Sequence, residues 1–336
     1  MINKSKVRGM FLGIASGDAL GMPAETFTEE RISLEFGRIF NYLKPDKHKW
    51  FDGHEAGTTT DDFQLTVSVA EALIDFDLNM DGQSAWHIKA LKQTDSGWGN
   101  TTRNSVKNLM NGVNWSKSGL NDGSNGVGNG VAMKIAPVAA MFALSPKNNN
   151  LSDCVDFLVK LNNMTHPTKI SLMSTTAICS ALIYCLNNDR LYLEVDDLKK
   201  LLFSNFKLVS LAPANKLYKY PDETDSVETR IVDLFVNLKS YFHFDFIKNY
   251  GGGSCYCYNS IPFSLGFFLK NPNSIEALYN VVNAGGDTDS NGSMVGAMLG
   301  ALNGEEIFPK HLVDGLKVKD QVFDLADRFC DKFDIC

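Results

Sequence analysis

The sequence has little positive charge for its size. It contains 32 Lys and Arg against 39 Asp and Glu, which gives a net charge of -7 and a pI near 5.4. Proteins that bind nucleic acid or anionic membranes over a broad surface are usually basic. We therefore expect no nucleic acid and no membrane as a partner. A small anionic ligand is still allowed, because local donors can bind it against the global charge.

Cysteines in metal-binding or disulfide spacing are also missing. The 7 cysteines are scattered, and Cys255 and Cys257 are too close for the C-x₂-C pair of a zinc site. An odd number of cysteines without a recognisable framework is typical of reduced thiols in a cytoplasmic protein. The sequence therefore predicts neither structural zinc nor a disulfide scaffold.

The uncharged run after Ser290 lacks the length of a membrane span. The uncharged run from Gly292 to Asn303 is shorter than the roughly 20 residues that a span needs, and we interpret it as a buried central helix. A shorter apolar run near the N-terminus ends at Asp18. It superficially resembles a signal peptide, but its apolar residues have helical spacing.

Alternating strand patterns, internal repeats and linker-like segments are missing as well. With 44% hydrophobic residues, the composition suits a large core, so we predict a single all-α domain over residues 1–336. A helical stretch at about 187–250 carries no chemical signature. Helical periodicity predicts helices at 6–20, for about four turns after Asp62, at 82–94, 131–140, 170–186, 195–206 and 226–244, and in the tail at 312–333.

Acidic residues stand out near the end of the chain. Asp287 and Asp289 follow a Gly-Gly turn and precede the hydroxyl of Ser290. Two carboxylates on one short bend can bind a single Mg²⁺ or Mn²⁺ through oxygen ligands. The alternative is a solvated helix start, where acidic groups interact favourably with the helix dipole.

A second acidic pair bears on the choice between metal binding and a solvated helix start. Asp61 and Asp62 follow Thr60 at the start of another apolar helix, and Thr60 is a candidate N-cap. If the fold brings the two pairs together, four carboxylates must share one pocket. Each would raise the pKa of the others, so the pocket would require cations. Either the pairs lie apart in solvent, or they meet and hold metal.

Several further residues are candidates for a cleft. The glycine-rich segment 126–130 precedes an expected helix and could present backbone N–H groups to phosphate, although it could also be a flexible connector. Trp98 lies between glycines, where a cleft position and a core position are equally compatible with the sequence. His166 lies at a helix junction, and Glu25 lies in a loop where a plain surface acid is the alternative.

The order and combination of these motifs resemble the ADP-ribosylglycohydrolase family, of the dinitrogenase-reductase-activating and ADP-ribosyl-acceptor hydrolase type. The resemblance covers nearly the whole chain. The segments that carry it are Gly17-Asp18-x-x-Gly21-x₃-Glu25, Thr60-Asp61-Asp62, Gly128-Asn129-Gly130-x-Ala132-Met133, Thr165-His166 and Gly285-Gly286-Asp287-Thr288-Asp289-Ser290.

The resemblance implies an orthogonal bundle of many helices with a cleft that holds two Mg²⁺ or Mn²⁺ ions. It implies that the substrate is ADP-ribose or an ADP-ribosylated protein, and we expect a monomer. The implied metal ligands are Thr60, Asp61, Asp62, Asp287, Asp289 and Ser290. The expected substrate contacts are Gly126, Val127, Gly128, Asn129, Gly130, His166, Trp98, Ser254 and Tyr256.

Three positions depart from the usual family pattern. Phe63 stands where Thr is usual after the two aspartates, Ser290 stands where Thr is usual, and Lys134 stands where Arg is usual. Ser290 keeps a hydroxyl, so it can still bind metal. Phe63 has lost one, which could weaken the order of the groups around the metals.

We therefore expect hydrolysis of the bond between ADP-ribose and an acceptor, with arginine as the first choice of acceptor. Asp61, Asp62, Glu25 and Asp289 are the candidate catalytic residues, orienting water or moving its proton. The alternatives are hydrolysis of serine-linked or other O-linked ADP-ribose, a non-catalytic binder of ADP-ribose or a modified partner, and a metal-dependent phosphohydrolase. We expect the stretch 187–250 to line the mouth of the cleft and to influence the acceptor.

Overall fold

The computed structural model describes residues 2–46, 48–120, 126–147, 150–190, 192–211 and 226–335. The regular structure in these ranges is helical and includes no β-strand, apart from isolated bridges between Thr28 and Gly285 and between Gly128 and Tyr256. The prediction of an all-α fold is confirmed. Six of the seven cysteines lie in these ranges as free thiols; Cys336 lies outside them.

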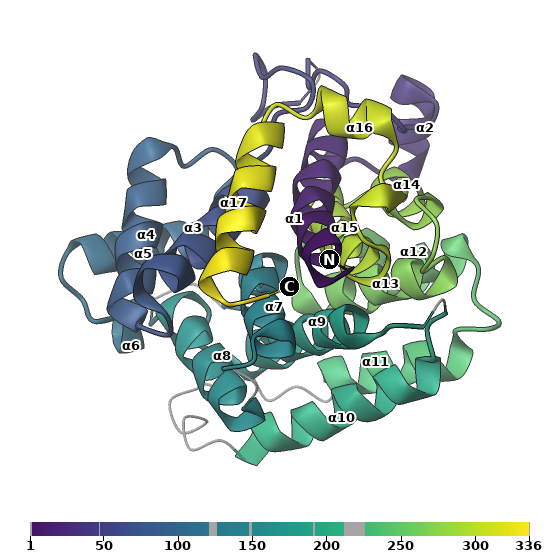
Figure 1. Cartoon of the computed structure of the whole chain (residues 1–336). Helices are drawn as coiled ribbons and strands as arrows, with labels where there is room; N and C mark the ends of the chain where they lie inside the picture. The colour runs from purple at the N-terminus through teal and green to yellow at the C-terminus, as the bar shows by residue number, and fades with distance from the viewer. Residues whose placement is uncertain are drawn as a thin grey trace.

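Most of the helices follow one another with short connections, but a long one, residues 37–60, joins α2 to α3 (Figure 1). Their bounds are α1 Ile2–Gly21, α2 Glu29–Phe36, α3 Asp61–Phe76, α4 Met80–Gln93, α5 Asn100–Met110, α6 Trp115–Ser118, α7 Ala136–Leu144, α8 Leu151–Thr165, α9 Lys169–Asn187, α10 Val195–Leu211, α11 Val227–Asn237, α12 His243–Asn249, α13 Cys257–Lys270, α14 Glu276–Asn283, α15 Thr288–Asn303, α16 Lys310–Gly315 and α17 Lys319–Lys332. Single 3₁₀ turns are η1 Met22–Ala24, η2 Ala132–Lys134, η4 Gly251–Gly253 and η5 Glu305–Ile307.

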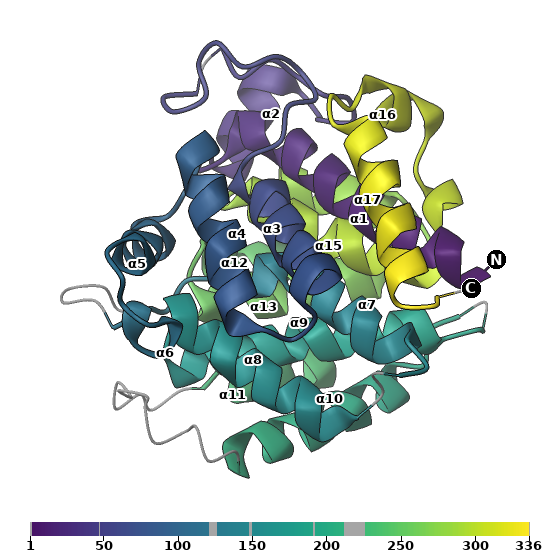
Figure 2. The same ribbon diagram turned by 60° about the vertical axis from the view of Figure 1, so that its left-hand side comes forward.

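Helices α1 and α15 form the centre of the molecule and lie side by side in both ribbon views (Figures 1 and 2). Their backbones touch, because glycines recur at every fourth residue on both facing sides. A Cβ on Gly13 would overlap the carbonyl of Gly296, and a Cβ on Gly17 would overlap the carbonyl of Gly292. The predicted central helix is thus confirmed. Its glycine face packs against an equivalent face of α1.

The other helices surround this pair. Helices α3 and α17 pack on one side of α1, while α13 and α14 pack on α15. Helix α9 contacts α7, α13 and α15, and α10 covers its outer side. The buried Lys6 of α1 donates hydrogen bonds to the carbonyls of Cys185, Leu186 and Asn188, so it caps the C-terminus of α9.

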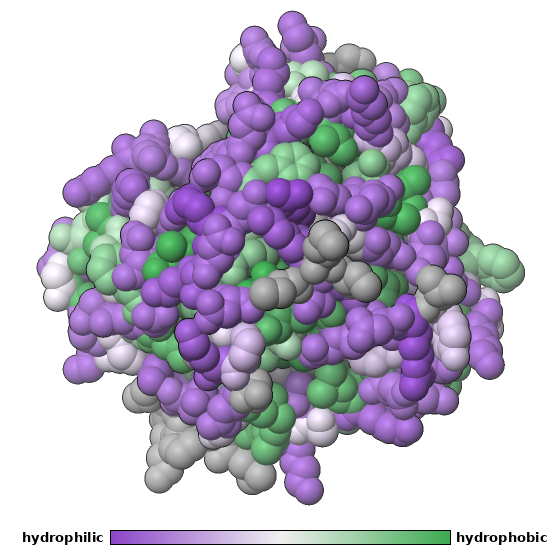
Figure 3. All heavy atoms as spheres, in the orientation of Figure 1, coloured by the Kyte–Doolittle hydropathy of each residue, from purple (hydrophilic) through white to green (hydrophobic). Residues whose placement is uncertain are grey.

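Helix α9 is the one described helix that is long and apolar enough to cross a membrane, and 83% of its apolar window is buried within the protein. That burial identifies it as a core helix of this fold. On the face shown in Figure 3, hydrophilic residues cover most of the surface and apolar residues form separate patches between them.

The structure corrects four sequence predictions. The single helix expected at 226–244 is divided, because α11 ends at Asn237 and α12 begins at His243. The helix expected at 131–140 begins only at Ala136, because the 3₁₀ turn η2 comes first. The tail contains two helices, α16 and α17, instead of one. The described residues of 187–250 pack α10 on α9 and α11 on α13 and do not line the cavity described below, so the expected place at its mouth is wrong for these residues. Residues 191 and 212–225 of the stretch lie outside the described ranges.

We predict that Gly13→Ala lowers the free energy of unfolding by about 1–3 kcal/mol or more, because the added methyl group overpacks the contact between α1 and α15. Chemical denaturation followed by circular dichroism measures the change. Gly128→Ala is the matched control, since its methyl would meet other atoms only at 3.8 Å. Equal stability of Gly13→Ala and the wild type would contradict the close contact.

Candidate active site

A cavity of about 340 Å³ opens beside the N-terminal ends of α3 and α15. Acidic residues line its floor and glycine-rich segments line its walls. The lining residues are Glu25, Asp61, Asp62, Gly97, Gly99, Asn100, Thr101, Thr102, Gly126, Val127, Gly128, Asn129, Gly130, Met133, His166, Cys255, Tyr256, Asp287, Asp289 and Ser290.

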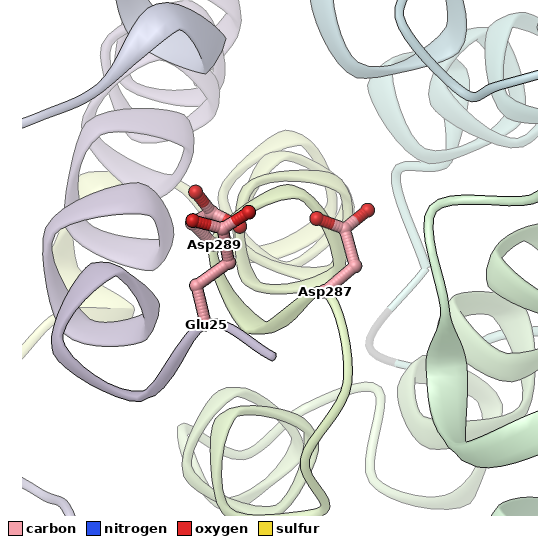
Figure 4. A group of neighbouring side chains, drawn as sticks. All are labelled: Glu25, Asp287 and Asp289. Atoms are coloured by element: carbon pink, nitrogen blue, oxygen red, sulfur yellow. The ribbon is translucent and has the colours of Figure 1, made fainter. Parts of the chain in front are cut away.

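Glu25, Asp287 and Asp289 converge at this floor (Figure 4). Each offers a carboxylate oxygen, and these atoms all lie within 4.8 Å of one another. Asp289 projects from the first turn of α15, Asp287 immediately precedes that helix, and Glu25 comes from the loop after α1. Residues far apart in the sequence therefore meet in one group.

Backbone hydrogen bonds hold the loop after α1 against the turn before α15. The N–H of Thr26 donates to the carbonyl of Gly286 at 2.6 Å, and the N–H of Gly286 donates to the carbonyl of Phe27 at 2.9 Å. Gly285 and Gly286 have φ values of 86° and 82°, which favour glycine. This turn thereby places Glu25 beside the two aspartates.

The second acidic pair joins the first from α3. The Ser290 hydroxyl donates to Asp62 Oδ2 at 3.1 Å, and the Thr60 hydroxyl lies 3.5 Å from Asp289 Oδ2. Asp61 and Asp62 are both buried. The sequence left open whether the two acidic pairs lie apart in solvent or lie together. In the structure they lie together.

The prediction that the side chain of Thr60 caps α3 is wrong. Thr60 occupies the N-cap position, but its side chain makes no capping hydrogen bond. The carboxylate of Asp18, from α1, accepts instead from the N–H groups of Thr60 and Phe63. A long-range contact thus satisfies the start of this helix.

The two glycine-rich segments form adjoining walls of the cavity. Asn129 N–H donates to the carbonyl of Cys255, and Cys257 N–H donates to the carbonyl of Val127, both at 3.0 Å. Gly128 and Tyr256 face each other in the resulting bridge. In such a pair the backbone N–H and C=O point away from the partner strand. The amide of Gly128 is therefore directed away from the bend at Tyr256.

The glycine-rich wall is also tied to the acidic floor. The Asn129 side chain donates to Asp287 Oδ2 at 2.6 Å, and Asn291 donates to the carbonyl of Gly253 at 2.6 Å. His166 also lines the cavity and packs against this wall, and a Cβ on Gly130 would come within 2.9 Å of its ring. Only glycine at position 130 leaves room for this packing.

Two predicted substrate contacts lie elsewhere. Trp98 is 2% exposed and donates its indole N–H to Gln64 Oε1 at 2.7 Å, so the alternative of a core position applies. Ser254 accepts a hydrogen bond from Asn259 at 3.0 Å and does not line the cavity. Its neighbours Cys255 and Tyr256 line the cavity instead.

Other residues at or near the cavity were not predicted. Three of them line it from the first turn of α5: Asn100, Thr101 and Thr102. Asp18 does not line the cavity, but its carboxylate accepts a hydrogen bond from the N–H of Thr60 at the start of α3. The polar turn before α5 was the available signal for the first group. For Asp18 the signal was its place in the motif Gly17-Asp18-x-x-Gly21-x₃-Glu25, in which Asp18 itself had no assigned role.

The comparisons with known proteins agree with this geometry. Residues 2–335 match the sequence pattern of a family described as ADP-ribosylglycohydrolase. The chain belongs to the ADP-ribosylglycohydrolase family. It is therefore a hydrolase of a glycosyl bond, and the fold expected from the resemblance is confirmed.

Named relatives and a solved structure extend the match over the whole chain. The ADP-ribosylhydrolase ARH3 of Xenopus tropicalis is 23% identical over 91% of this chain and 89% of its own length. The ADP-ribosyl-[dinitrogen reductase] glycohydrolase of Rhodospirillum rubrum is 24% identical over 93% and 90%. A solved chain of an ADP-ribosylglycohydrolase-related protein complex, 20% identical, superimposes with a TM-score of 0.68 over 98% of both chains.

Burial and mutual repulsion raise the pKa values of the acidic residues at this family site. Burial, followed by the charge of Asp289, raises the pKa of Asp61 to about 7 and that of Glu25 to about 10. Burial likewise raises the pKa values of Asp62, Asp287 and Asp289. These carboxylates are poorly accommodated as anions unless positive charge is added.

The donor set fits a hard divalent cation. Such cations prefer carboxylate and hydroxyl oxygens, which this floor supplies. Asp62 Oδ1 is buried and has no hydrogen-bond partner among the described residues, so it is free to accept an ion. We therefore find the residues compatible with the metal dependence that is general in the family.

Among the described residues, the buried Lys134 acts on Asp61 by its charge, and no ion pair joins it to this cluster. Its Nζ has no hydrogen-bond partner in the described part of the chain. Burial lowers its pKa to about 7, while the charge of Asp61 acts in the opposite direction. Burial, and then the charge of Lys134, lower the pKa of His166 to about 3, so this imidazole is neutral near pH 7.

We predict that Mn²⁺ raises the melting temperature more at about pH 8 than at about pH 5. A carboxylate whose pKa is raised by folding stabilises the metal-free protein below its unfolded pKa of about 4 and loses that contribution as pH rises. The loss extends through about 7 for Asp61 and about 10 for Glu25. Thermal denaturation in EDTA and in MnCl₂ measures the difference.

The variant Asp289→Asn is the internal comparison for this pH series. It removes a charge from the centre of the cluster, so the difference between EDTA and MnCl₂ should shrink at every pH. A wild-type response to Mn²⁺ that is independent of pH would contradict the electrostatic explanation.

Proposed function

We propose that this protein is a metal-dependent ADP-ribosyl hydrolase that releases ADP-ribose from a modified acceptor by attack of water at the anomeric carbon. The observation that carries the proposal is the convergence of acids from α3, α15 and the loop after α1 beneath a glycine-rich wall. The cavity thus combines a site for divalent cations with a site for an anionic ligand. ADP-ribose presents ribose hydroxyls to the first and a diphosphate to the second.

The proposed ligands for two Mg²⁺ or Mn²⁺ ions are the acids and hydroxyls of the floor. When bound, these ions would supply positive charge for the ribose hydroxyls and would lower the pKa of the attacking water. The proposed ligand residues that line the cavity are Asp61, Asp62, Asp287, Asp289 and Ser290, with Glu25 beside them. Thr60 does not line the cavity, and it is included because its hydroxyl lies 3.5 Å from Asp289 Oδ2.

The remaining residues of the cavity would bind and orient the substrate. The segment 126–130 would hold the diphosphate with its amides, so that binding energy distant from the reacting bond places the sugar over the acids. Tyr256 and the neutral His166 would lie along the nucleotide. A carboxylate of Glu25, Asp61, Asp62 or Asp289 would orient the water or accept its proton.

An arginine side chain is the acceptor that the site suits best in this proposal. A guanidinium group keeps its positive charge near neutral pH. The floor has five carboxylates, from Glu25, Asp61, Asp62, Asp287 and Asp289, so with two divalent cations bound it would keep one net negative charge (five negative against four positive). A serine hydroxyl offers no positive charge. The substrate would then be an ADP-ribosylated protein. We further propose a cytoplasmic monomer, in keeping with the free thiols of the described chain.

We predict that the purified protein releases free ADP-ribose from an ADP-ribosylated protein with Mg²⁺ or Mn²⁺ and loses this activity in EDTA. Asp61→Asn and Asp289→Asn should each lower kcat by at least about 100-fold, because each removes a charge from the reaction centre. Chromatographic measurement of ADP-ribose follows the reaction. Asp320→Asn, which changes an exposed acid on α17, is the matched control and should retain full activity.

Full activity in EDTA would refute metal dependence. Isothermal titration with ADP-ribose identifies a non-catalytic binder, which would bind the ligand yet release none from a modified protein. Release of phosphate in place of ADP-ribose would indicate a phosphohydrolase.

We predict faster hydrolysis of an arginine-linked than of a serine-linked ADP-ribosyl peptide of otherwise identical sequence. The expected kcat/KM ratio is about tenfold or more, if the acidic floor contributes one favourable charge interaction of about 1.4 kcal/mol. Mass spectrometry of both peptides in one reaction measures the ratio. A preference for serine would assign the protein to O-linked substrates and refute the arginine proposal.

A further inference from the structure

We propose that Asp18 is a positioning residue for the metal site: its carboxylate holds the backbone on both sides of Asp61 and Asp62 and fixes where these two acids point. The inference rests on the proposed function, since it concerns the same cations. Asp18 does not line the cavity, so it would not contact the metals. Besides burial and the charge of Asp289, its charge contributes to the raised pKa values of Asp62 and Glu25, and its hydrogen bonds act through the start of α3.

The hydrogen bonds to Asp18 bracket the acidic pair. The N–H of Thr60, directly before Asp61, lies 2.8 Å from Asp18 Oδ1 and 2.9 Å from Oδ2. The N–H of Phe63, directly after Asp62, donates to Oδ2 at 3.0 Å. One side chain thus fixes the residues immediately before and after both candidate ligands.

The N–H groups at the start of α3 depend on the carboxylate of Asp18, because the N-cap residue does not bind them with its own side chain. The first N–H groups of a helix have no partner within the helix and require a side chain, water or ligand. Thr60 makes no capping hydrogen bond with its own side chain. Asp18 is 0% exposed, so its carboxylate is shielded from water where it meets these amides.

The position of Asp18 on α1 connects α3 to the other half of the metal site. Gly17 and Gly21, on either side of it, contact the backbone of α15 at Gly292 and Thr288. The Thr288 hydroxyl also donates to the carbonyl of Gly21 at 2.7 Å. Asp18 therefore holds α3 against the same stretch of α1 that contacts the start of α15, where Asp289 is located.

Substitution of Asp18 tests this role through metal binding, independently of hydrolysis. Isothermal titration with MnCl₂ should show a Kd about 10-fold to 100-fold weaker in Asp18→Ala, the range found when groups that orient metal ligands are removed. Asp18→Asn loses the same negative charge as Asp18→Ala but keeps one acceptor oxygen, so its Kd should lie between those of Asp18→Ala and the wild type. The difference between the two variants measures positioning apart from charge, and equal Kd values in both would overturn the positioning role. In both variants hydrogen exchange at the amides of Thr60 and Phe63 should accelerate.

Lys6→Met is the matched control for a loss of stability. It removes a buried polar anchor from the same helix, but that anchor caps α9 away from the acids. Lys6→Met should therefore lower the melting temperature and leave the Kd for Mn²⁺ unchanged. An unchanged Kd in Asp18→Ala, or an equal loss of affinity in Lys6→Met, would overturn the positioning role.

The outcomes separate this inference from the proposed function. A wild-type protein that binds Mn²⁺ without releasing ADP-ribose refutes the hydrolase and leaves the role of Asp18 intact. Hydrolysis by the wild type together with an unchanged Kd in Asp18→Ala refutes only the role of Asp18. If neither variant folds, exchange in the wild type decides: slow exchange at Thr60 and Phe63 supports the contact, and fast exchange overturns it.

Discussion

The backbone contact between α1 and α15 is the constraint on which the rest of the structure depends. Side chains normally keep helix axes about 8–10 Å apart, and glycines allow a closer approach. Here glycines on both helices remove every Cβ that would separate them. The same contact fixes the ends of both helices, which carry Asp18, the loop with Glu25, and the turn with Asp287 and Asp289.

This contact also explains how so many carboxylates come to share one small volume. Raised pKa values at Asp61, Asp62, Asp287 and Asp289 show that burying these groups as anions is unfavourable. A flexible site would relieve the repulsion by moving the acids apart. The helix pair and the hydrogen-bonded turn prevent that movement, so the arrangement suits binding of cations better than stability of the metal-free protein.

Local sequence patterns predicted the elements that depend on local physics. The apolar periodicity after Asp62 predicted α3, and the uncharged run from Gly292 to Asn303 predicted a buried central helix. The same reasoning failed where a distant group supplies the energy. Thr60 was expected to cap α3, but Asp18 of α1 accepts its amide. Trp98 was equally compatible with a cleft and the core, because sequence does not reveal that Gln64 accepts its indole N–H.

The sequence by itself determined the helical class, the acidic charge balance and the residue types of the site, because periodicity, composition and motif order are properties of the chain. The motif order also identified the family that the comparisons established. Only the tertiary structure decided that the two acidic pairs meet, that the stretch 187–250 stays away from the cavity as far as it is described, and that α1 holds the start of α3. These facts depend on which helices touch one another. Contacts between residues that lie far apart in the sequence leave no periodic signal in it.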